Sequence, residues 1–405
     1  MPDALRQTRP NDIILLLTAR GLRGFGDGFA IIILPVYLAA IGLTTVQIGF
    51  VAAASLLGTA ALTLAVGFVA SRYELRTLLL VGASLIILTG LIFPNVGNIA
   101  LILVIAFVGS LNPSAGDLGI LVPLEHATLT REAADHDRTR IFARYSLIGT
   151  LATAAGSLAA AAPGFLLSYG VADIVALKSM FYLYALLGFV AALLYSRFPR
   201  DHTHIAATPR TALRQSRGIV FKLAALFSLD AFAGGFVVQS LLAVWLFERF
   251  DLSLAAVSVF FFWSTFLSAF SFPVAAWIAK RVGLINTMVY THVPSSLCLI
   301  VAAFSQSLTF TLVLLLIRSA LSQMDVPTRS SYVMAVVTPA ERPAAASVTA
   351  VPRSLASSIS PAFAGFMLAG AFPGLPLVLC GVLKITYDLA LLYLFRHVKP
   401  PEEIQ

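Results

Sequence analysis

The chain consists of long apolar runs that short polar stretches separate. Runs of roughly 18 to 28 residues recur from end to end, and a helix of that length crosses a hydrocarbon core of about 30 Å. The pattern therefore predicts an all-α polytopic membrane protein with about twelve transmembrane helices. The predicted spans are residues 13–41, 44–70, 77–94, 99–123, 141–168, 174–198, 219–247, 253–279, 286–306, 308–334, 344–371 and 375–396.

The composition supports this class and excludes others. Hydrophobic residues make up 59% of the chain and charged residues only 11%, against about 25% charged in soluble domains. The net charge of +8 does not indicate nucleic-acid binding, because no basic tract interleaved with aromatics occurs outside the spans. Cys298 and Cys380 lie in apolar runs and are interpreted as free thiols, and the six histidines show no metal-ligand spacing. We expect no metal and no cofactor.

The basic residues of the loops predict the orientation. One set of loops holds Arg6, Arg9, Arg72, Arg76, Arg131, Arg138, Arg140, Lys280, Arg281, Arg342, Arg396 and Lys399, whereas the opposite set holds only Lys178 and Arg249. The positive-inside rule then places both termini in the cytoplasm. We expect the protein in the cell membrane. An arginine-rich stretch, 199–218, is predicted to be a cytoplasmic linker between two six-helix bundles at 1–198 and 219–405.

The two halves resemble each other in sequence. "GDGFAIIILPVYL" in the first span matches "GGFVVQSLLAVWL" in the seventh, and "GFVASRYELRTLLL" after the second matches "AWIAKRVGLINTMV" after the eighth. The second match aligns Arg72 with Arg281, and "GSLNPSAGDLG" against "SALSQMDVPTR" aligns Asp117 with Asp325. Parallel repeats joined by a basic loop are the layout of a large class of secondary transporters.

These features resemble the major facilitator superfamily over essentially the whole chain. The family signature in the loop after the second span stands here as Gly67, Ser71, Arg72 and Arg76, with Ser71 where the family has Asp. The resemblance implies a rocker-switch carrier rather than an enzyme. It also implies a central cavity lined by the first, fourth, seventh and tenth helices, with the second, fifth, eighth and eleventh as gates.

The first span carries three charges, Arg20, Arg23 and Asp27. A charge at bilayer depth costs at least about 2.5–3.5 kcal/mol on insertion scales, so it should face protein or water and have a partner. The spacings of three and four place all three on one helical face, and Arg23 and Asp27 form an i, i+4 couple. We interpret this face as cavity lining, with Asp27 as a substrate- or proton-binding group. The alternative is a structural ion pair inside the bundle.

Other charges in the spans extend the predicted site. Aligning the repeats sets Asp230 opposite Arg23, which predicts a pair across the interface of the halves; the alternative is a packing hydrogen bond. Gln239 lies off the face of Asp230 and is a weaker member of the site. Arg318 lies in the middle of the tenth span and is predicted to bind an anionic group bidentately. The alternative is a structural pair with Asp325, two turns further on.

A cytoplasmic gate is predicted from charges towards the ends of the spans. Its members are Arg72, Arg76, Asp117, Glu125, Asp325, Arg144 and Arg353, with Arg329 nearby. Interfacial anchoring is the alternative for Glu125 and Arg144. Lys384 and Asp388 are spaced i, i+4 on the twelfth span and are interpreted as a structural pair.

Three functions stay open from the sequence. The first is proton-coupled export of a small amphiphilic or drug-like compound with Asp27 titrating, although the Gly-Pro pair of the family's antiporters is missing from the fifth span. The second is a carrier of small organic anions that uses Arg23 and Arg318. The third is a transporter-like sensor that moves nothing. We expect a monomer whose partners are a small-molecule substrate, a coupling proton and the bilayer.

Overall fold

The computed structural model describes residues 10–69, 72–114, 119–132, 138–198, 213–338 and 341–398. Ser71 of the signature, Asp117 of the predicted gate and residues 199–212 of the predicted linker lie outside them. The helices are α1 Pro10–Ala40, α2 Thr45–Val69, α3 Leu75–Ile92 with the 3-10 turn η1 Phe93–Asn95, α4 Ile99–Val108, α5 Leu121–Glu132, α6 Arg138–Ala159, α7 Ala162–Ser168, α8 Asp173–Ser196, α9 Arg217–Gly235, α10 Gln239–Phe250, α11 Leu254–Val282, α12 Leu284–Phe304, α13 Leu308–Ser322, α14 Asp325–Val336, α15 Arg342–Leu368 and α16 Leu375–Phe395.

The predicted fold class is confirmed: the described chain is helical and forms two pseudo-symmetric bundles, α1–α8 and α9–α16. Ten of its helical segments are long and apolar enough to cross a membrane. The two further predicted spans fall short for different reasons. The fourth is divided into α4 and α5, and α15 is long enough but rich in serine, with Ser358 and Ser360 buried inside the protein.

Four of the predicted spans are discontinuous, which the pattern of apolar runs did not predict. The fourth consists of α4 and α5, the fifth of α6 and α7, the seventh of α9 and α10, and the tenth of α13 and α14. A break frees backbone groups that need partners inside a membrane. Two breaks partly satisfy each other, since the Ser240 amide at the start of α10 donates to the Pro113 carbonyl between α4 and α5 over 3.1 Å.

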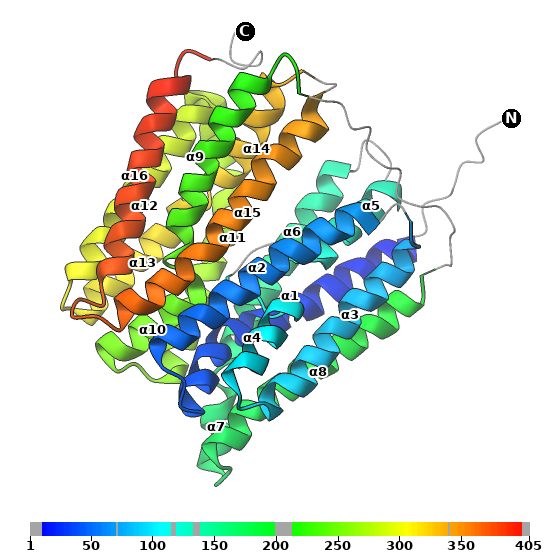
Figure 1. Cartoon of the computed structure of the whole chain (residues 1–405), viewed down its shortest axis with the longest axis vertical. Coiled ribbons are helices and arrows are strands. Elements are labelled where there is room, and N and C mark those ends of the chain that lie inside the picture. Colours follow the sequence, from blue (N-terminus) through cyan, green and yellow to red (C-terminus); the bar gives the residue numbers. More distant parts are fainter. Residues whose placement is uncertain are drawn as a thin grey trace, which may run out of the picture.

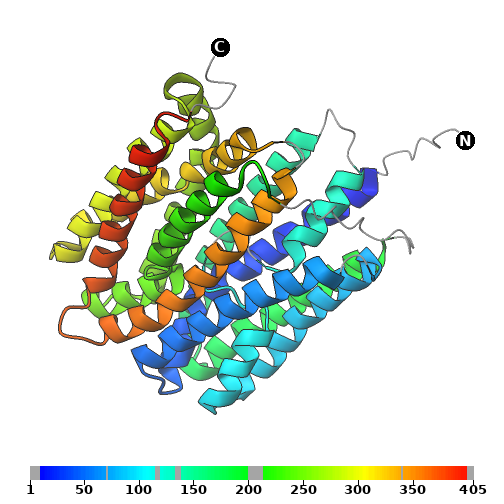
Figure 2. The same ribbon diagram turned by 45° about the horizontal axis from the view of Figure 1, so that its top comes forward.

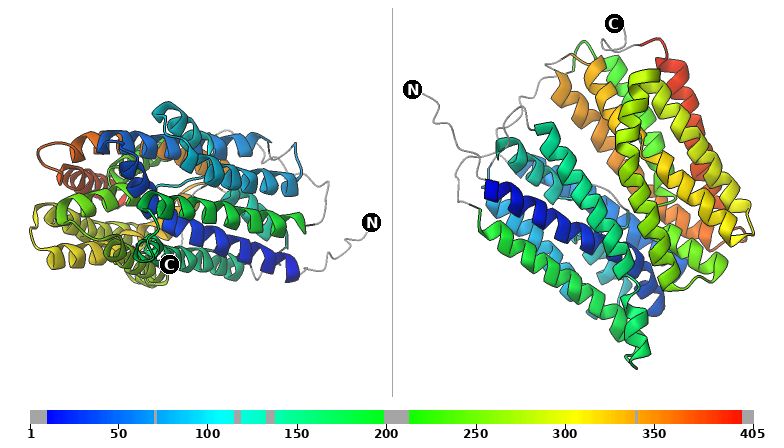
Figure 3. Two further views of the ribbon diagram at one scale, coloured as in Figure 1. Left: turned by 90° about the horizontal axis from the view of Figure 1, so that it is seen from below. Right: turned by 180° about the vertical axis from the view of Figure 1, so that it is seen from behind.

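The two halves touch at one end of the bundle. We call the end where α1 begins and α16 ends the terminal end, and the opposite end, with the α1–α2 turn and α10, the distal end (Figure 1). Across the halves, α2 packs against α15, α6 against α11, and α1 against α10. Figure 2 shows α15 beside α2, and the rear view in Figure 3 shows α6 beside α11. Towards the terminal end the ribbons of the halves diverge (Figure 1).

Close contacts join the halves at the distal end. A Cβ on Gly49, near the start of α2, would lie 2.7 Å from the Pro361 carbonyl and 2.8 Å from the Gly365 Cα of α15. The Thr45 hydroxyl donates to Glu248 over 2.7 Å, between α2 and α10. Together with the Ser240–Pro113 bond, these contacts hold the distal ends of the two bundles against each other.

Glycines let α1 and α6 pack backbone to backbone. A Cβ on Gly28 would lie 2.1 Å from the Thr153 carbonyl, and one on Gly156 would lie 2.0 Å from the Phe25 carbonyl. In a membrane, small residues drive helix association because they permit such close van der Waals contact. The glycines of the first span therefore fix the position of α1 within its own half.

We predict that Gly28→Ala separates α1 from α6 and destabilises the protein. Overpacking of a tight interior costs about 1–3 kcal/mol, and here the obstacle is backbone, which cannot swing aside. The thermal unfolding midpoint in detergent should fall clearly. Gly164→Ala is the matched control, because nothing lies within 4 Å of its added Cβ. Equal midpoints for the two variants would contradict the close packing.

Glu341 anchors the start of the second half. Its carboxylate, just before α15, accepts the backbone N–H groups of Arg214 at 2.6 Å, Gln215 at 3.0 Å and Ser216 at 2.9 Å, just before α9. These bonds to backbone amides, first that of Arg214, lower the pKa of the Glu341 carboxyl to about 2. The carboxylate thus satisfies amides at a helix N-terminus, where negative charge is favoured.

We predict that this anchor weakens in acid. A carboxyl whose pKa is lower in the folded state contributes stability above its unfolded pKa of about 4.3, and that stability is lost as the pH falls towards the folded pKa. Hydrogen exchange of the 214–216 amides, corrected for intrinsic rates, should be slow at pH 6 and accelerate between about pH 4 and 2. In Glu341→Gln it should be fast throughout. Protection that persists in the variant would disprove the anchor.

Candidate functional site

The N-terminal half buries one ion pair surrounded by tyrosines. The guanidinium of Arg23, near the middle of α1, pairs with Glu125 in the second turn of α5. Tyr145 of α6 and Tyr195 of α8 both donate hydrogen bonds to the same carboxylate. Arg23 is 7% exposed and Glu125 is fully buried, so four helices meet at one neutralised cluster. A buried pair with several added hydrogen bonds is the arrangement in which burial of charge is tolerated.

Asp27 stands apart from this cluster. It is half-buried, and its carboxylate accepts one hydrogen bond, from the Tyr184 hydroxyl of α8 at 3.3 Å. Arg23 and Arg20 are near enough to act on it electrostatically, yet it forms no ion pair within the described residues. Arg20 instead lies over the Tyr145 ring, with its guanidinium carbon 5.2 Å from the ring centroid.

The C-terminal half buries a larger network centred on Asp230 of α9. One carboxylate oxygen of Asp230 accepts from Lys384 of α16 at 2.6 Å and the other from Arg329 of α14 at 3.1 Å. Arg329 also pairs with Asp325 in the first turn of α14. Asp230, Asp325 and Arg329 are all nearly inaccessible to solvent. Two cations therefore hold one buried carboxylate from both sides.

The network continues to two residues on outer helices. Lys384 Nζ lies 3.2 Å from Nε2 of His292 on α12, and His292 Nδ1 lies 3.1 Å from Oδ1 of Asp388 on α16. His292 is 2% exposed and Asp388 is fully buried. The predicted Lys384–Asp388 pair is therefore wrong, because the imidazole of His292 lies between the two. We call the six residues Asp230, Asp325, Arg329, Lys384, His292 and Asp388 the C-half network.

The two clusters are charge-reversed counterparts. Helices α5 and α14 have 12 residues each and carry Val-Pro at their second and third positions. This register aligns Glu125 with Arg329, each the fifth residue of its helix, rather than Asp117 with Asp325 as predicted. With Arg23 opposite Asp230, the pair Arg23–Glu125 in one half becomes Asp230–Arg329 in the other. The shared Val-Pro dipeptide was the sequence signal for this correspondence.

The structure separates several residues that we expected to meet. Arg23 pairs with Glu125 rather than with Asp27 or Asp230, because both pairs close within their own halves. Arg318 does not pair with Asp325, because the two residues lie on separate helices, α13 and α14. Asp325 pairs with Arg329 of its own helix instead. The half-buried Arg318 side chain has no hydrogen-bond or ionic partner in the described chain, and its electrostatic neighbours are Cys298 and Cys380. Gln239 begins α10 at the distal closure.

The predicted gate is only partly assembled in this conformation. Arg72, Arg144 and Arg353 are exposed and Arg76 is half-buried, and none of the four forms a side-chain hydrogen bond or ion pair with a described residue. Glu125 and Asp325 belong to the two buried clusters instead. Asp117 lies outside the described residues. The gating roles of these residues stay predictions.

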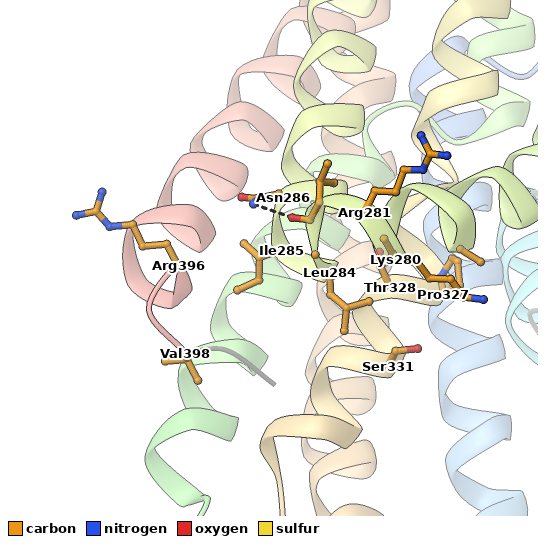
Figure 4. A pocket seen from close by; sticks show the side chains of 14 residues that line it. Lys280, Arg281, Leu284, Ile285, Asn286, Pro327, Thr328, Ser331, Arg396 and Val398 are labelled. Atoms are coloured by element: carbon orange, nitrogen blue, oxygen red, sulfur yellow. Dashed lines mark hydrogen bonds between the residues drawn. The ribbon is translucent and has the colours of Figure 1, made fainter. Parts of the chain in front are cut away.

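A basic pocket of about 660 Å³ lies at the terminal end of the C-terminal half (Figure 4). Lys280, Arg281 and Arg396 line it together with polar residues of α12 and α14. Arg281 is the residue that the repeat aligns with Arg72. Every lining residue belongs to one half, whereas a site that alternates between two openings needs both. This pocket therefore does not join the two halves.

The fold and the buried clusters define a polytopic carrier of two halves, and comparison with known proteins names its family. Residues 16–317 match the model of the Major Facilitator Superfamily, and the chain belongs to this family. It is a transporter rather than an enzyme. An uncharacterized membrane protein of Saccharomyces cerevisiae is 24% identical over 423 residues, which cover 96% of this chain and 94% of that protein.

Solved transporters share the fold. The xylose transporter XylE of E. coli, in its inward-open conformation, has a TM-score of 0.74 at 15% identity, covering 96% of both chains. The nucleoside transporter NupG has a TM-score of 0.73 at 14% identity, covering 96% of this chain and all of the other. The human organic anion transporter MFSD10 has a TM-score of 0.64 at 14% identity, covering 94% and 99%. At these identities the likeness establishes the fold alone.

We predict that Glu125→Gln destabilises the protein by about 3–5 kcal/mol, the cost of leaving one member of a buried ion pair without its counter-charge. The thermal unfolding midpoint of the purified protein reports the loss. Adding Arg23→Gln should recover part of it, because the uncompensated guanidinium is removed. Glu248→Gln, which alters an exposed hydrogen bond, should cost less than about 1 kcal/mol. The cluster would lose its structural role if Glu125→Gln matched this control.

Proposed function

We propose that this protein is a proton-coupled secondary transporter that exports a small amphiphilic compound by alternating access, with Asp27 as the group that binds proton or substrate. The observation that carries the proposal is the state of Asp27. Among the described acidic residues inside the bundle, Glu125, Asp230, Asp325 and Asp388 each have a basic or imidazole partner, whereas Asp27 has one tyrosine hydroxyl. An embedded carboxylate with no ionic partner is a default functional site.

The geometry supports an exchange between proton and substrate at this carboxylate. Asp27 is half-buried, so it is open to a ligand, and Tyr184 steadies it without neutralising it. A proton on Asp27 removes a charge from the bilayer interior, and so does a cationic group of a bound amphiphile. The two ligands therefore compete for one carboxylate, which couples the movement of one to that of the other.

Alternation follows from the contacts between the halves. We propose that the terminal end faces the cytoplasm, as the basic loops indicate. The distal contacts Thr45–Glu248 and Ser240–Pro113 then hold the halves together on the outer side, and the ribbons of the halves diverge towards the inner side (Figure 1). Rocking would break these distal contacts and bring the exposed arginines of the terminal end together with acidic partners.

One observation favours a second function, transport of a small organic anion. Arg318 is a half-buried guanidinium on α13 with no ionic partner among the described residues. A guanidinium clamps a carboxylate in a bidentate geometry. Its neighbours Cys298 and Cys380 lie on α12 and α16, within the second half, so an anion would reach it only through that half. We therefore regard Arg318 as a weaker candidate than Asp27 for the main substrate-binding group.

We predict that Asp27→Asn abolishes proton-driven accumulation and leaves exchange down a gradient intact. The amide imitates the protonated carboxyl, so the cycle loses its proton step. A coupling free energy of about 1–3 kcal/mol corresponds to a factor of ~5–150. The proton-driven accumulation ratio of the wild type should be lost by this factor in the variant. Purified protein in proteoliposomes with an imposed pH gradient is assayed with ethidium as a cationic amphiphile and with benzoate as an organic anion.

Asp251→Asn is the matched control, because Asp251 is exposed in the loop after α10. Uphill ethidium transport by Asp27→Asn at the control rate, with unchanged pH dependence, would remove Asp27 from coupling. Transport of benzoate alone, lost in Arg318→Gln, would establish the second function. No flux of any tested class in the wild type would reject transport of these compounds.

A further inference from the structure

The C-half network contains a histidine and an aspartate that the proposed exchange at Asp27 does not use. Asp388, His292, Lys384 and Asp230 form an unbroken line of contacts at 3.1, 3.2 and 2.6 Å. Arg329 extends the line from Asp230 at 3.1 Å to the broken tenth span. The line thus runs from the outer helices α12 and α16 to α9 and α14, which belong to discontinuous spans.

The donors along this line define the protonation state of His292. An ammonium group has donors only, so Lys384 Nζ donates to Nε2 of His292. Nδ1 then carries the single ring hydrogen and donates it to Asp388 Oδ1. His292 is therefore neutral in this arrangement. A proton on Nε2 would place its N–H against an N–H of the Lys384 ammonium group. Two donors cannot bond to each other, so Lys384 would move away from Nε2.

Asp388 provides an independent sign that a proton belongs here. Its Oδ2 is buried and has no hydrogen-bond partner among the described residues. A buried carboxylate oxygen without a donor carries its full desolvation penalty. A proton on His292 would place a positive charge next to this carboxylate and offset part of that penalty.

The charges that face the pair favour the same change. With His292 neutral, three carboxylates and two cations give the network a formal charge of −1, and one proton brings it to zero. Asp230 lies on α9, Lys384, Asp388 and Tyr387 on α16, and Arg329 and Asp325 on α14. Two other helices pack near the pair: the Arg318 carbonyl of α13 accepts a hydrogen bond from Ser295, and the exposed Arg353 of α15 acts electrostatically on Asp230. On α11, no described titratable side chain contacts His292.

We propose that His292 and Asp388 form a proton-binding site in the C-terminal half, separate from Asp27. In the step, a proton from water adds to Nε2 of His292, the hydrogen bond from Lys384 to Nε2 breaks, and the new Nε2–H turns to Asp230 Oδ1, now 3.9 Å away. The imidazolium then shares Asp230 with Lys384 and Arg329. Protonation therefore changes the contacts of α12 with α9, the helix that precedes the distal closure.

This inference rests on the proposed proton coupling, and its test measures conformation rather than flux. Spin labels on Thr77→Cys and Lys222→Cys, exposed at the terminal ends of α3 and α9, report the separation of the halves, with Cys298 and Cys380 replaced by alanine. In the otherwise native protein the distance distribution should shift as the pH is lowered from about 8 to about 5, the range over which it is measured. His292→Gln and Asp388→Asn should each lose this shift.

His397→Gln is the matched control, because His397 lies exposed after α16. Its pH-dependent shift should match that of the parent. If His292→Gln fails to fold, Asp388→Asn decides, since its amide keeps the shape and supplies a donor where Oδ2 has none. A folded variant with an unchanged shift, or a parent without any shift, overturns the proton site. Failure of uphill ethidium transport in the wild type rejects the proposed function alone, because the distance measurement is independent of flux.

Discussion

Neutralisation of buried charge within each half is the constraint on which this structure depends. An ion moved into a low-dielectric interior pays a penalty that only close counter-charges and added hydrogen bonds offset. Glu125 is held by one guanidinium and two tyrosine hydroxyls, and Asp230 by an ammonium and a guanidinium. These two centres fix α1, α5, α6 and α8 in one half and α9, α14 and α16 in the other. Each half can therefore move as a unit without breaking these ion pairs.

The two halves share one architecture, but the positions of the buried cation and anion are exchanged between them. In the first half the cation is on the first span and the anion on the fourth; in the second half the order is inverted. The second half adds Lys384, His292 and Asp388, which have no counterpart among the partners of Arg23 and Glu125. We infer that the first half presents the substrate group at Asp27 and the second half carries the network that responds to protons.

The sequence predicted the membrane spans, the two bundles and the family, because run length and repeats are local properties of the chain. It identified charged residues inside the spans but not which of them pair. The i, i+4 spacings of Arg23–Asp27 and Lys384–Asp388 are real, yet Glu125 and His292, from other helices, bind these side chains instead. The helix breaks were also missed, although Asn112, Pro113 and Ser114 interrupt the fourth apolar run. The repeated Val-Pro of α5 and α14 was the local signal that marked the correct register.

The closure of each ion pair within its own half bears on how the chain is made. A membrane protein enters the bilayer from its N-terminus as it is synthesised, and the second half is still on the ribosome when the first is inserted. Because Arg23 finds Glu125 about a hundred residues later, and not in the second half, its charge is matched as soon as the fourth span arrives. The Arg23–Glu125 pair can thus form before the second half is synthesised, and Arg23 needs no partner from that half.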